Sequence, residues 1–228
     1  MPRTHTSRGY ETELQKLRDR VLLMGAKVED IIKRSMQALV DRDTELAKRT
    51  ILADRRINQL ELAIDQLCLQ ILARRQPVAS DLRFITIAMK LVTDLERIGD
   101  LAVNLCERVV ELNEEPPLKP YVDLPRMAEE AQEMVHEALD AFVEGNPEKA
   151  DAVIKQDAIV DAYYVQIFRE LLTYMMEDPR TIYRATRLQS IAKYLERIGD
   201  HGTNIAEMVI FNVRGKDVRH AGKLLDEL

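Results

Sequence analysis

Apolar residues recur at intervals of three and four along most of this chain, which is the stripe of an amphipathic α-helix. Such stripes predict helices over residues 10–41, 46–72 and 84–112, with Asp43 or Thr44 as the N-cap of the second. The order then restarts and predicts helices over 127–143 and 150–176, followed by a last helix that ends near Gly215. Pro147 stands where the first turn of a helix accepts proline. The predicted fold class is all-α.

The pattern of the first three helices is repeated in the second half of the chain. The hexapeptide LERIGD at 95–100 returns unchanged at 195–200, and LVDRDTELA at 39–47 aligns with FVEGNPEKA at 142–150. Short connections require antiparallel neighbours. We therefore predict two tandem antiparallel three-helix bundles related by internal pseudo-symmetry, at 10–112 and 126–214. The segment 113–125, which holds four prolines, is predicted to be an extended linker, and 1–9 and 215–228 are predicted to be flexible tails.

Each copy of the hexapeptide places a glycine inside a predicted helix. At about 100° per residue, Gly99 falls on the core face of its helix. Glycine costs about 1 kcal/mol relative to alanine in a helix interior. We therefore expect the backbone of a neighbouring helix to come close at Gly99 and Gly199.

Acidic and amide side chains border the core face on the second and third helices of each half. In chain order they are Asp54, Asn58, Glu61, Asp65, Glu96, Asp100, Asn104 and Glu107, then Asp157, Asp161, Glu196, Asp200, Asn204 and Glu207. Like charges four residues apart on a helix repel by a few tenths of a kcal/mol, and two facing rows add to that repulsion. Oxygen ligands of this kind suit magnesium, calcium and manganese, and carboxylate clusters also hold iron. The rows therefore predict metal binding.

Two other interpretations of these acids stay open. The acids could pair with Arg55, Arg56, Arg97 or Arg197 on solvated helix edges, which is the usual fate of surface charge. Four D/E-x-x-x-D/N elements at matching places in two repeats favour metal binding over that alternative. A di-iron carboxylate enzyme would need two Glu-x-x-His motifs, and only Glu133 to His136 fits.

Composition and charge narrow the classes of function further. The net charge of −6, from 33 basic and 39 acidic residues, argues against a general nucleic-acid binder. Cys68 and Cys106 stand among apolar residues at helical spacing, so we expect both in the core of a protein from a reducing compartment. The sequence has no GxxxxGK[ST] phosphate loop and no evident nucleophile, so no catalytic residue and no organic cofactor are predicted. The absence of a membrane span or signal peptide pattern predicts a cytoplasmic protein.

Five motifs resemble, in this order, those of the PhoU family of bacterial phosphate-uptake regulators. They are RRQPVASDLR, DLERIGDLAVN, LLTYMMEDPRTI, YLERIGDHGTNIAE and VRGKDVRHAG, and the resemblance covers nearly the whole chain. It implies two pseudo-symmetric three-helix bundles with multinuclear metal clusters on E/D-x-x-x-D motifs. The matching pairs here are Asp54–Asn58, Glu96–Asp100, Asp157–Asp161 and Glu196–Asp200. Asn58 departs from the pattern, and an amide in place of a carboxylate implies a weaker first site.

The resemblance also implies a function and partners. The chain would restrain the phosphate-starvation response by linking the ATPase subunit of the phosphate-specific ABC transporter to a membrane sensor histidine kinase. A homodimer is expected, with peripheral membrane association through these partners. The metal stays open among divalent or trivalent ions of iron, magnesium, manganese, zinc or calcium. The alternatives are a metal-independent helical adaptor and a carboxylate-bridged metalloenzyme.

Overall fold

The helices follow one another along the chain without a β-strand in the part that the structure, a computed structural model, describes, residues 8–77 and 79–215. Within these residues lie α1 (Arg8–Asp41), α2 (Thr44–Ala53), α3 (Arg55–Arg75), α4 (Ala79–Asn113), α5 (Asp123–Glu144), α6 (Pro147–Glu177), the 3-10 helix η1 (Pro179–Thr181) and α7 (Ile182–Arg214). Of the predicted tails, residues 1–7 and 216–228 lie outside the described range.

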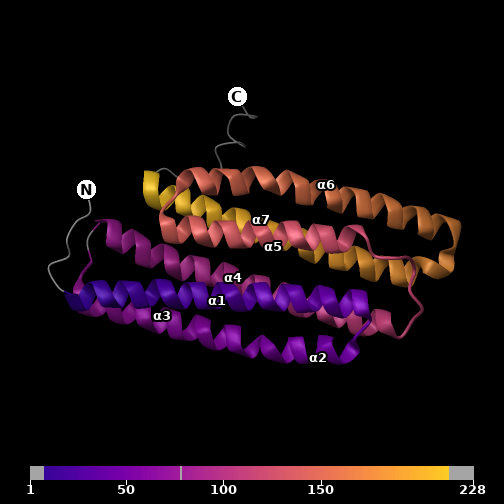
Figure 1. Cartoon of the computed structure of the whole chain (residues 1–228), viewed down its shortest axis with the longest axis horizontal. Helices are drawn as coiled ribbons and strands as arrows, with labels where there is room; N and C mark the ends of the chain where they lie inside the picture. Colours follow the sequence, from indigo (N-terminus) through magenta and orange to yellow (C-terminus); the bar gives the residue numbers. More distant parts are fainter. Residues whose placement is uncertain (1–7, 78, 216–228) are drawn as a thin grey trace.

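Two three-helix bundles lie side by side (Figure 1). In the first bundle α2 and α3 lie end to end and together act as one of the three helices, packed against α1 and α4. Helices α5, α6 and α7 form the second bundle. The bundles meet where α1 packs on α5 and α4 packs on α7. The predicted all-α fold of two three-helix units is therefore confirmed. No helix among the described residues is long and apolar enough to cross a membrane.

The prediction of a single helix over 46–72 is wrong, because the helix is interrupted at Asp54, between α2 and α3. Asp54 keeps helical backbone angles, with φ −57° and ψ −32°. Its carbonyl oxygen accepts the N–H of Ile57 at 2.8 Å and that of Asn58 at 3.2 Å. The interruption is thus one tightened turn. The apolar period runs through it without a change, so the sequence pattern carries no sign of it.

Helix ends follow ordinary capping chemistry. Asp43 is the N-cap of α2 and accepts the N–H of Leu46 at 2.8 Å, as one of the two predicted caps. Pro147 stands in the first turn of α6, as predicted, with Asn146 as the N-cap. Gly215 is the C-cap of α7, and its left-handed φ of 68° suits glycine.

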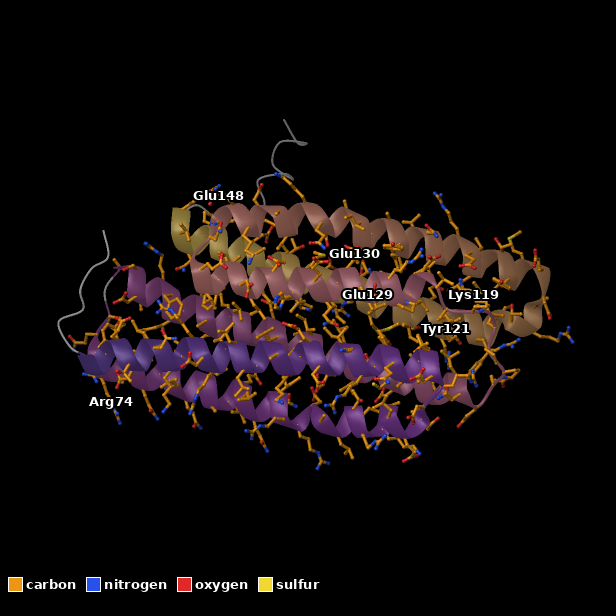
Figure 2. All side chains as sticks on the ribbon, in the orientation of Figure 1. Arg74, Lys119, Tyr121, Glu129, Glu130 and Glu148 are labelled. Atoms are coloured by element: carbon orange, nitrogen blue, oxygen red, sulfur yellow. The ribbon has the colours of Figure 1, made fainter. Side chains whose placement is uncertain are left out.

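The segment between the bundles is shorter than the predicted linker and is packed against both bundles. Helix α5 already begins at Asp123, with Pro125 in its first turn. Tyr121 packs against the core, and Lys119 pairs with Glu170 of α6. Figure 2 shows Lys119 and Tyr121 on this segment beside the second bundle.

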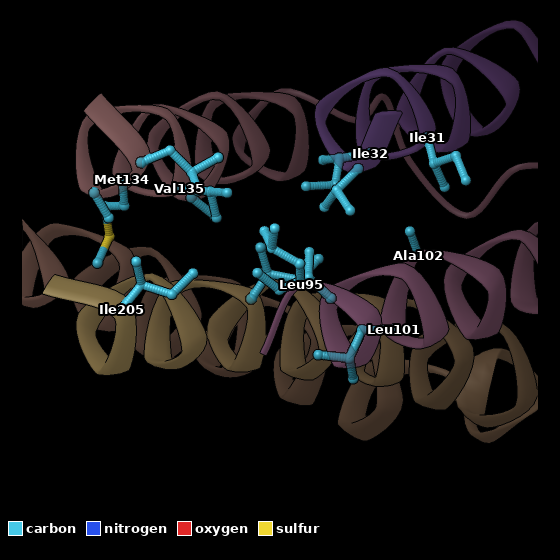
Figure 3. Packing of buried hydrophobic residues seen from close by; sticks show 14 of the residues in the cluster. Ile31, Ile32, Leu95, Leu101, Ala102, Met134, Val135 and Ile205 are labelled. Atoms are coloured by element: carbon cyan, nitrogen blue, oxygen red, sulfur yellow. The ribbon is translucent and has the colours of Figure 1, made fainter. Parts of the chain in front are cut away.

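The core runs continuously through both bundles. Ile32 of α1 and Val135 of α5 point from neighbouring helices toward α4 and α7 (Figure 3). Cys68 and Cys106 are both buried and unpaired, as predicted. Burial raises the pKa of each thiol to about 12, so both stay protonated at neutral pH.

Candidate metal centres

The first bundle gathers five polar side chains into one group, which we name the first cluster. Its members are Asp54, Asn58, Glu61, Glu96 and Asp100. The α2–α3 junction and α3 supply the first three, and α4 supplies Glu96 and Asp100. The facing rows predicted from helical periodicity thus meet in the structure.

Asp54 is the most enclosed member of the first cluster, with 9% of its surface exposed. Its Oδ2 accepts a hydrogen bond from Asn58 Nδ2 at 3.2 Å. Among the described residues its Oδ1 is buried without a hydrogen-bond partner, and so is Oδ1 of Asn58. Two buried oxygen acceptors without donors are costly. They supply lone pairs that a cation would satisfy.

The electrostatics of the first cluster disfavour simultaneous negative charges on its four carboxylates. Burial raises the pKa of Asp54, and the charge of Asp100 raises it further. Burial likewise raises the pKa of Glu96, with the charges of Asp100, Glu61 and Asp54 adding to the effect. Arg97 offsets part of this repulsion through contacts of 3.5 Å to Glu96 and 3.2 Å to Asp100.

The second cluster lies at the equivalent place between α6 and α7. It consists of Asp157, Asp161, Glu196 and Asp200, all four of them carboxylates. Burial and the charges of Asp161 and Asp200 raise the pKa of Asp157 to about 6. Oε2 of Glu196 is buried and has no hydrogen-bond partner in the part of the chain that the structure describes. This cluster therefore also combines carboxylates that repel one another with a buried acceptor that lacks a donor.

A lysine that periodicity did not single out reaches the second cluster. Lys193 Nζ donates to Glu196 Oε1 at 2.6 Å and lies 5.3 Å from the centre of the Tyr164 ring. The lysine charge also lowers the pKa of Asp200, against the dominant effect of burial. Lys193 precedes Glu196 by three residues, which puts both on one helix face. That spacing is the signal that could have revealed it.

Five predicted residues lie at the margins of the clusters or away from them. Asp65 follows Glu61 by one turn of α3, and burial raises its pKa. Glu107 contacts Arg108 at 3.7 Å, and Asn204 donates to Asp94 of the first bundle at 3.5 Å. Asn104 and Glu207 lie farther along α4 and α7 than Asp100 and Asp200.

The predicted approach of a helix backbone at the repeated glycines is wrong. The atoms nearest to a β-carbon at Gly99 would belong to the side chains of Asp54 and Ile57, and those at Gly199 to the side chains of Val160, Asp157 and Met134. The close backbone instead faces Gly202, where main-chain atoms of Met134 and Val135 would lie 3.5 Å from a β-carbon.

The side chains do not form a closed ligand set. Within residues 8–77 and 79–215, no group of three or more His, Cys, Asp or Glu side chains is arranged so that it could hold a metal ion. Mutual repulsion and the contacts to Arg97 and Lys193 account for this arrangement. Metal binding therefore stays a prediction, and it would require rotation of cluster side chains toward a shared ion.

Comparison with known proteins connects this geometry to a family. A family model described as the PhoU domain matches the chain twice, at residues 21–109 and 124–209. The chain belongs to the PhoU family. Each PhoU domain match coincides with one three-helix bundle and contains one acidic cluster.

Several PhoU proteins are similar to this chain over most of its length. The phosphate-specific transport system accessory protein PhoU homolog of Pseudomonas aeruginosa is 47% identical over 219 residues, which are 96% of this chain and 90% of that protein. PhoU of Escherichia coli, described as a phosphate-specific transport system accessory protein, is 38% identical over 96% of this chain and 90% of its own length. The family consists of regulatory accessory proteins and not of enzymes.

Crystal structures of PhoU share the fold. That of Pseudomonas aeruginosa PhoU matches with a TM-score of 0.87 and 46% identity, covering 91% of this chain and all (100%) of the other. A phosphate transport system regulatory protein PhoU from Streptococcus pneumoniae matches with a TM-score of 0.85 and 31% identity, covering 92% and 99%. The PhoU fold is therefore shared by chains that are identical at less than a third of their aligned positions.

Proposed function

We propose that this chain is a negative regulator of the phosphate-starvation response whose two acidic clusters bind metal ions. In this role it connects the ATPase subunit of a phosphate-specific ABC transporter with a membrane sensor histidine kinase. The proposal places the protein in the cytoplasm as a homodimer, at the membrane only through these partners. Support for the transport context comes from the PhoU relatives, which are named as phosphate-specific transport accessory proteins.

The observation that carries the metal part is the buried, unpartnered Oδ1 of Asp54. In the first cluster, Asp54, Asn58, Glu96 and Asp100 would hold the ions. Glu61 could take part, because it lies close enough to Asp100 for the charge of Asp100 to raise its pKa. Asp157, Asp161, Glu196 and Asp200 would hold them in the second. All these donors are oxygens, which fits magnesium, manganese, calcium or iron. Bound ions would supply the positive charge that fixes α3 to α4 and α6 to α7.

The metalloenzyme alternative has no support in the bundle geometry. His136 of the single Glu-x-x-His motif is directed at Glu29 of the other bundle, with Nδ1 at 3.2 Å from Oε1. Its side chain is 54% exposed. A di-iron site needs such a histidine inside one bundle.

Metal content tests the metal part. Protein purified without chelators is compared with Glu96→Ala/Asp100→Ala, Glu196→Ala/Asp200→Ala and the fourfold variant by elemental analysis. We expect each double variant to lose the ions of one cluster and the fourfold variant to lose both. Equal metal content in all four proteins, or none in the wild type, favours the metal-independent adaptor.

Gene expression tests the regulatory part. Deleting the gene in its host should raise expression of phosphate-starvation genes while phosphate is plentiful, and a plasmid copy should restore repression. Co-purification of the transporter ATPase and the sensor kinase with the tagged chain would identify the partners. Unchanged expression in the deletion strain would contradict the regulatory role.

A further inference from the structure

The two clusters differ in the groups that stand beside the equivalent glutamates, Glu96 and Glu196. In the second bundle Lys193 bonds to Glu196 and lies over the ring of Tyr164. One hundred positions earlier the lysine is replaced by Thr93, whose hydroxyl donates to the main-chain oxygen of Met89 at 3.2 Å.

The bundles also differ at the position that Tyr164 occupies in the second bundle. The alignment that pairs Asp54 with Asp157 pairs Glu61 with Tyr164. An acid that extends the first cluster is therefore replaced by an aromatic ring in the second. The ring presents a face to which an ammonium group is attracted. Only the second cluster thus combines a lysine with an aromatic face.

The contact between Lys193 and Glu196 is close, yet the lysine remains accessible. The two atoms are 2.6 Å apart, and the Glu196 side chain is 15% exposed, against 47% for that of Lys193. A charge-assisted contact of this length is among the stronger hydrogen bonds. The exposed lysine stem can nevertheless swing away at little steric cost.

We propose that Lys193 is an internal competitor of the metal ion in the second cluster, holding Glu196 until an ion displaces its ammonium group. The inference rests on the proposed metal binding. The ammonium group already occupies Oε1 of Glu196. A metal ion bound by the same carboxylate would come close to it, and close approach of the two cations is repulsive. The displaced ammonium group stays near the Tyr164 ring. Lys193 accordingly sets the metal concentration at which the second cluster fills.

Arg197 provides a matched control for the general effect of charge. It follows Glu196 directly on α7 and is exposed, but it makes no ion pair among the residues that the structure describes. Removing Arg197 deletes one positive charge from the same turn without freeing Glu196. Competition by contact therefore predicts a larger effect for Lys193 than for Arg197.

Manganese titration of the full-length chain tests the inference. The background is Glu96→Ala/Asp100→Ala, so that only the second cluster reports, and free Mn²⁺ is followed by its electron paramagnetic resonance signal. We expect Lys193→Met to tighten Mn²⁺ binding by about three- to tenfold and Arg197→Met by less than about twofold. Equal changes, or none for Lys193→Met, would overturn the competitor role while leaving metal binding intact.

The reciprocal transplant supplies an independent result. In the Glu196→Ala/Asp200→Ala background, Thr93→Lys with Glu61→Tyr should weaken Mn²⁺ binding to the first cluster more than Glu61→Tyr alone. An affinity equal to that of Glu61→Tyr alone counts against the inference. Circular dichroism and unfolding midpoints are measured for all variants. The inference requires the difference in Mn²⁺ affinity between variants that are equally helical and equally stable. If the wild-type chain binds no Mn²⁺, the proposed metal function fails, and the inference fails with it.

Discussion

Asp54 and Gly99 lie directly against each other, so that a β-carbon at residue 99 would be 2.8 Å from Oδ1 of Asp54. The equivalent pair in the second bundle is looser: a β-carbon at Gly199 would be 3.4 Å from Val160 Cγ1 and 3.5 Å from Asp157 Oδ1. In both bundles the glycine of the repeated hexapeptide therefore makes room for a cluster carboxylate. A methyl group at Gly99 would force the Asp54 carboxylate to move, whereas Gly199 tolerates one.

Alanine at the two glycines should have unequal effects. Gly199→Ala gains helix propensity without a clash, so the free energy of unfolding should rise by up to about 1 kcal/mol. Gly99→Ala gains the same propensity but displaces Asp54, so we expect no net gain and weaker Mn²⁺ binding by the first cluster. Urea unfolding and Mn²⁺ titration measure both effects. A stabilised Gly99→Ala variant with unchanged Mn²⁺ affinity would contradict the proposed role of Gly99.

Helical periodicity predicts some features of the clusters and carries no sign of others. Helical periodicity fixes the direction of a side chain around its own axis, so Glu96, Asp100 and the core side of Gly99 were predictable. Which atoms fill the space opposite depends on how neighbouring helices are placed, and periodicity carries no such information. The acid beside Gly99, the interruption at Asp54 and the contact of Lys193 with Tyr164 all depend on that placement.

Arg42 is expected to be a stability determinant of the junction between the bundles. It follows the end of α1, and its Nη2 donates to the carbonyl oxygens of Asn113 at 3.1 Å and Glu115 at 2.5 Å. These groups lie at and just past the end of α4, where carbonyls lack helical partners. Arg42→Met should lower the free energy of unfolding by about 1–3 kcal/mol, as measured in urea.

The control for Arg42 is Arg34, an arginine of α1 whose contact is exposed. Arg34 pairs with Asp30 one turn earlier at 2.8 Å. Arg34→Met should change the free energy of unfolding by no more than about 0.5 kcal/mol. Similar losses for both variants would mean that the carbonyl contacts of Arg42 contribute nothing specific.

The contact between His136 and Glu29 should make the stability of the bundle interface depend on pH. A hydrogen bond to the Glu29 carboxylate raises the pKa of His136 above its ordinary 6.5. A raised histidine pKa means that the folded state favours the proton. The stabilisation is complete below pH 6.5 and is lost as pH rises through the folded pKa.

Thermal unfolding of the wild type and of His136→Gln between pH 5.5 and pH 8.5 measures this contribution. The difference between the two midpoints should shrink as pH rises, and Glu29→Gln should shrink it at every pH. A difference that is constant over this range would exclude the ionic contribution of His136, since other titrating groups are common to both proteins.

The Asp54 carboxylate should lower the stability of the metal-free chain and strengthen its binding of metal. This carboxylate is buried and its pKa is raised, first by that burial and then by the charge of Asp100, so the folded state disfavours its charge. In Asp54→Asn the side-chain oxygen can still accept the hydrogen bond of Asn58, while the charge is gone. With a chelator present, the variant should therefore be more stable than the wild type by roughly 1 kcal/mol.

With Mn²⁺ present, the order should reverse, because the wild type gains binding energy that the amide variant largely loses. Urea unfolding in chelator and in Mn²⁺ gives both values for each protein. Asp151→Asn is the control: this acid of α6 pairs with Lys155 at 2.6 Å, and its side chain is 50% exposed. Its replacement should change either value by less than about 0.5 kcal/mol. If Asp54→Asn is destabilising in chelator as well, the carboxylate serves the fold as a hydrogen-bond acceptor. That result would contradict the view that its charge is unfavourable until a metal ion binds.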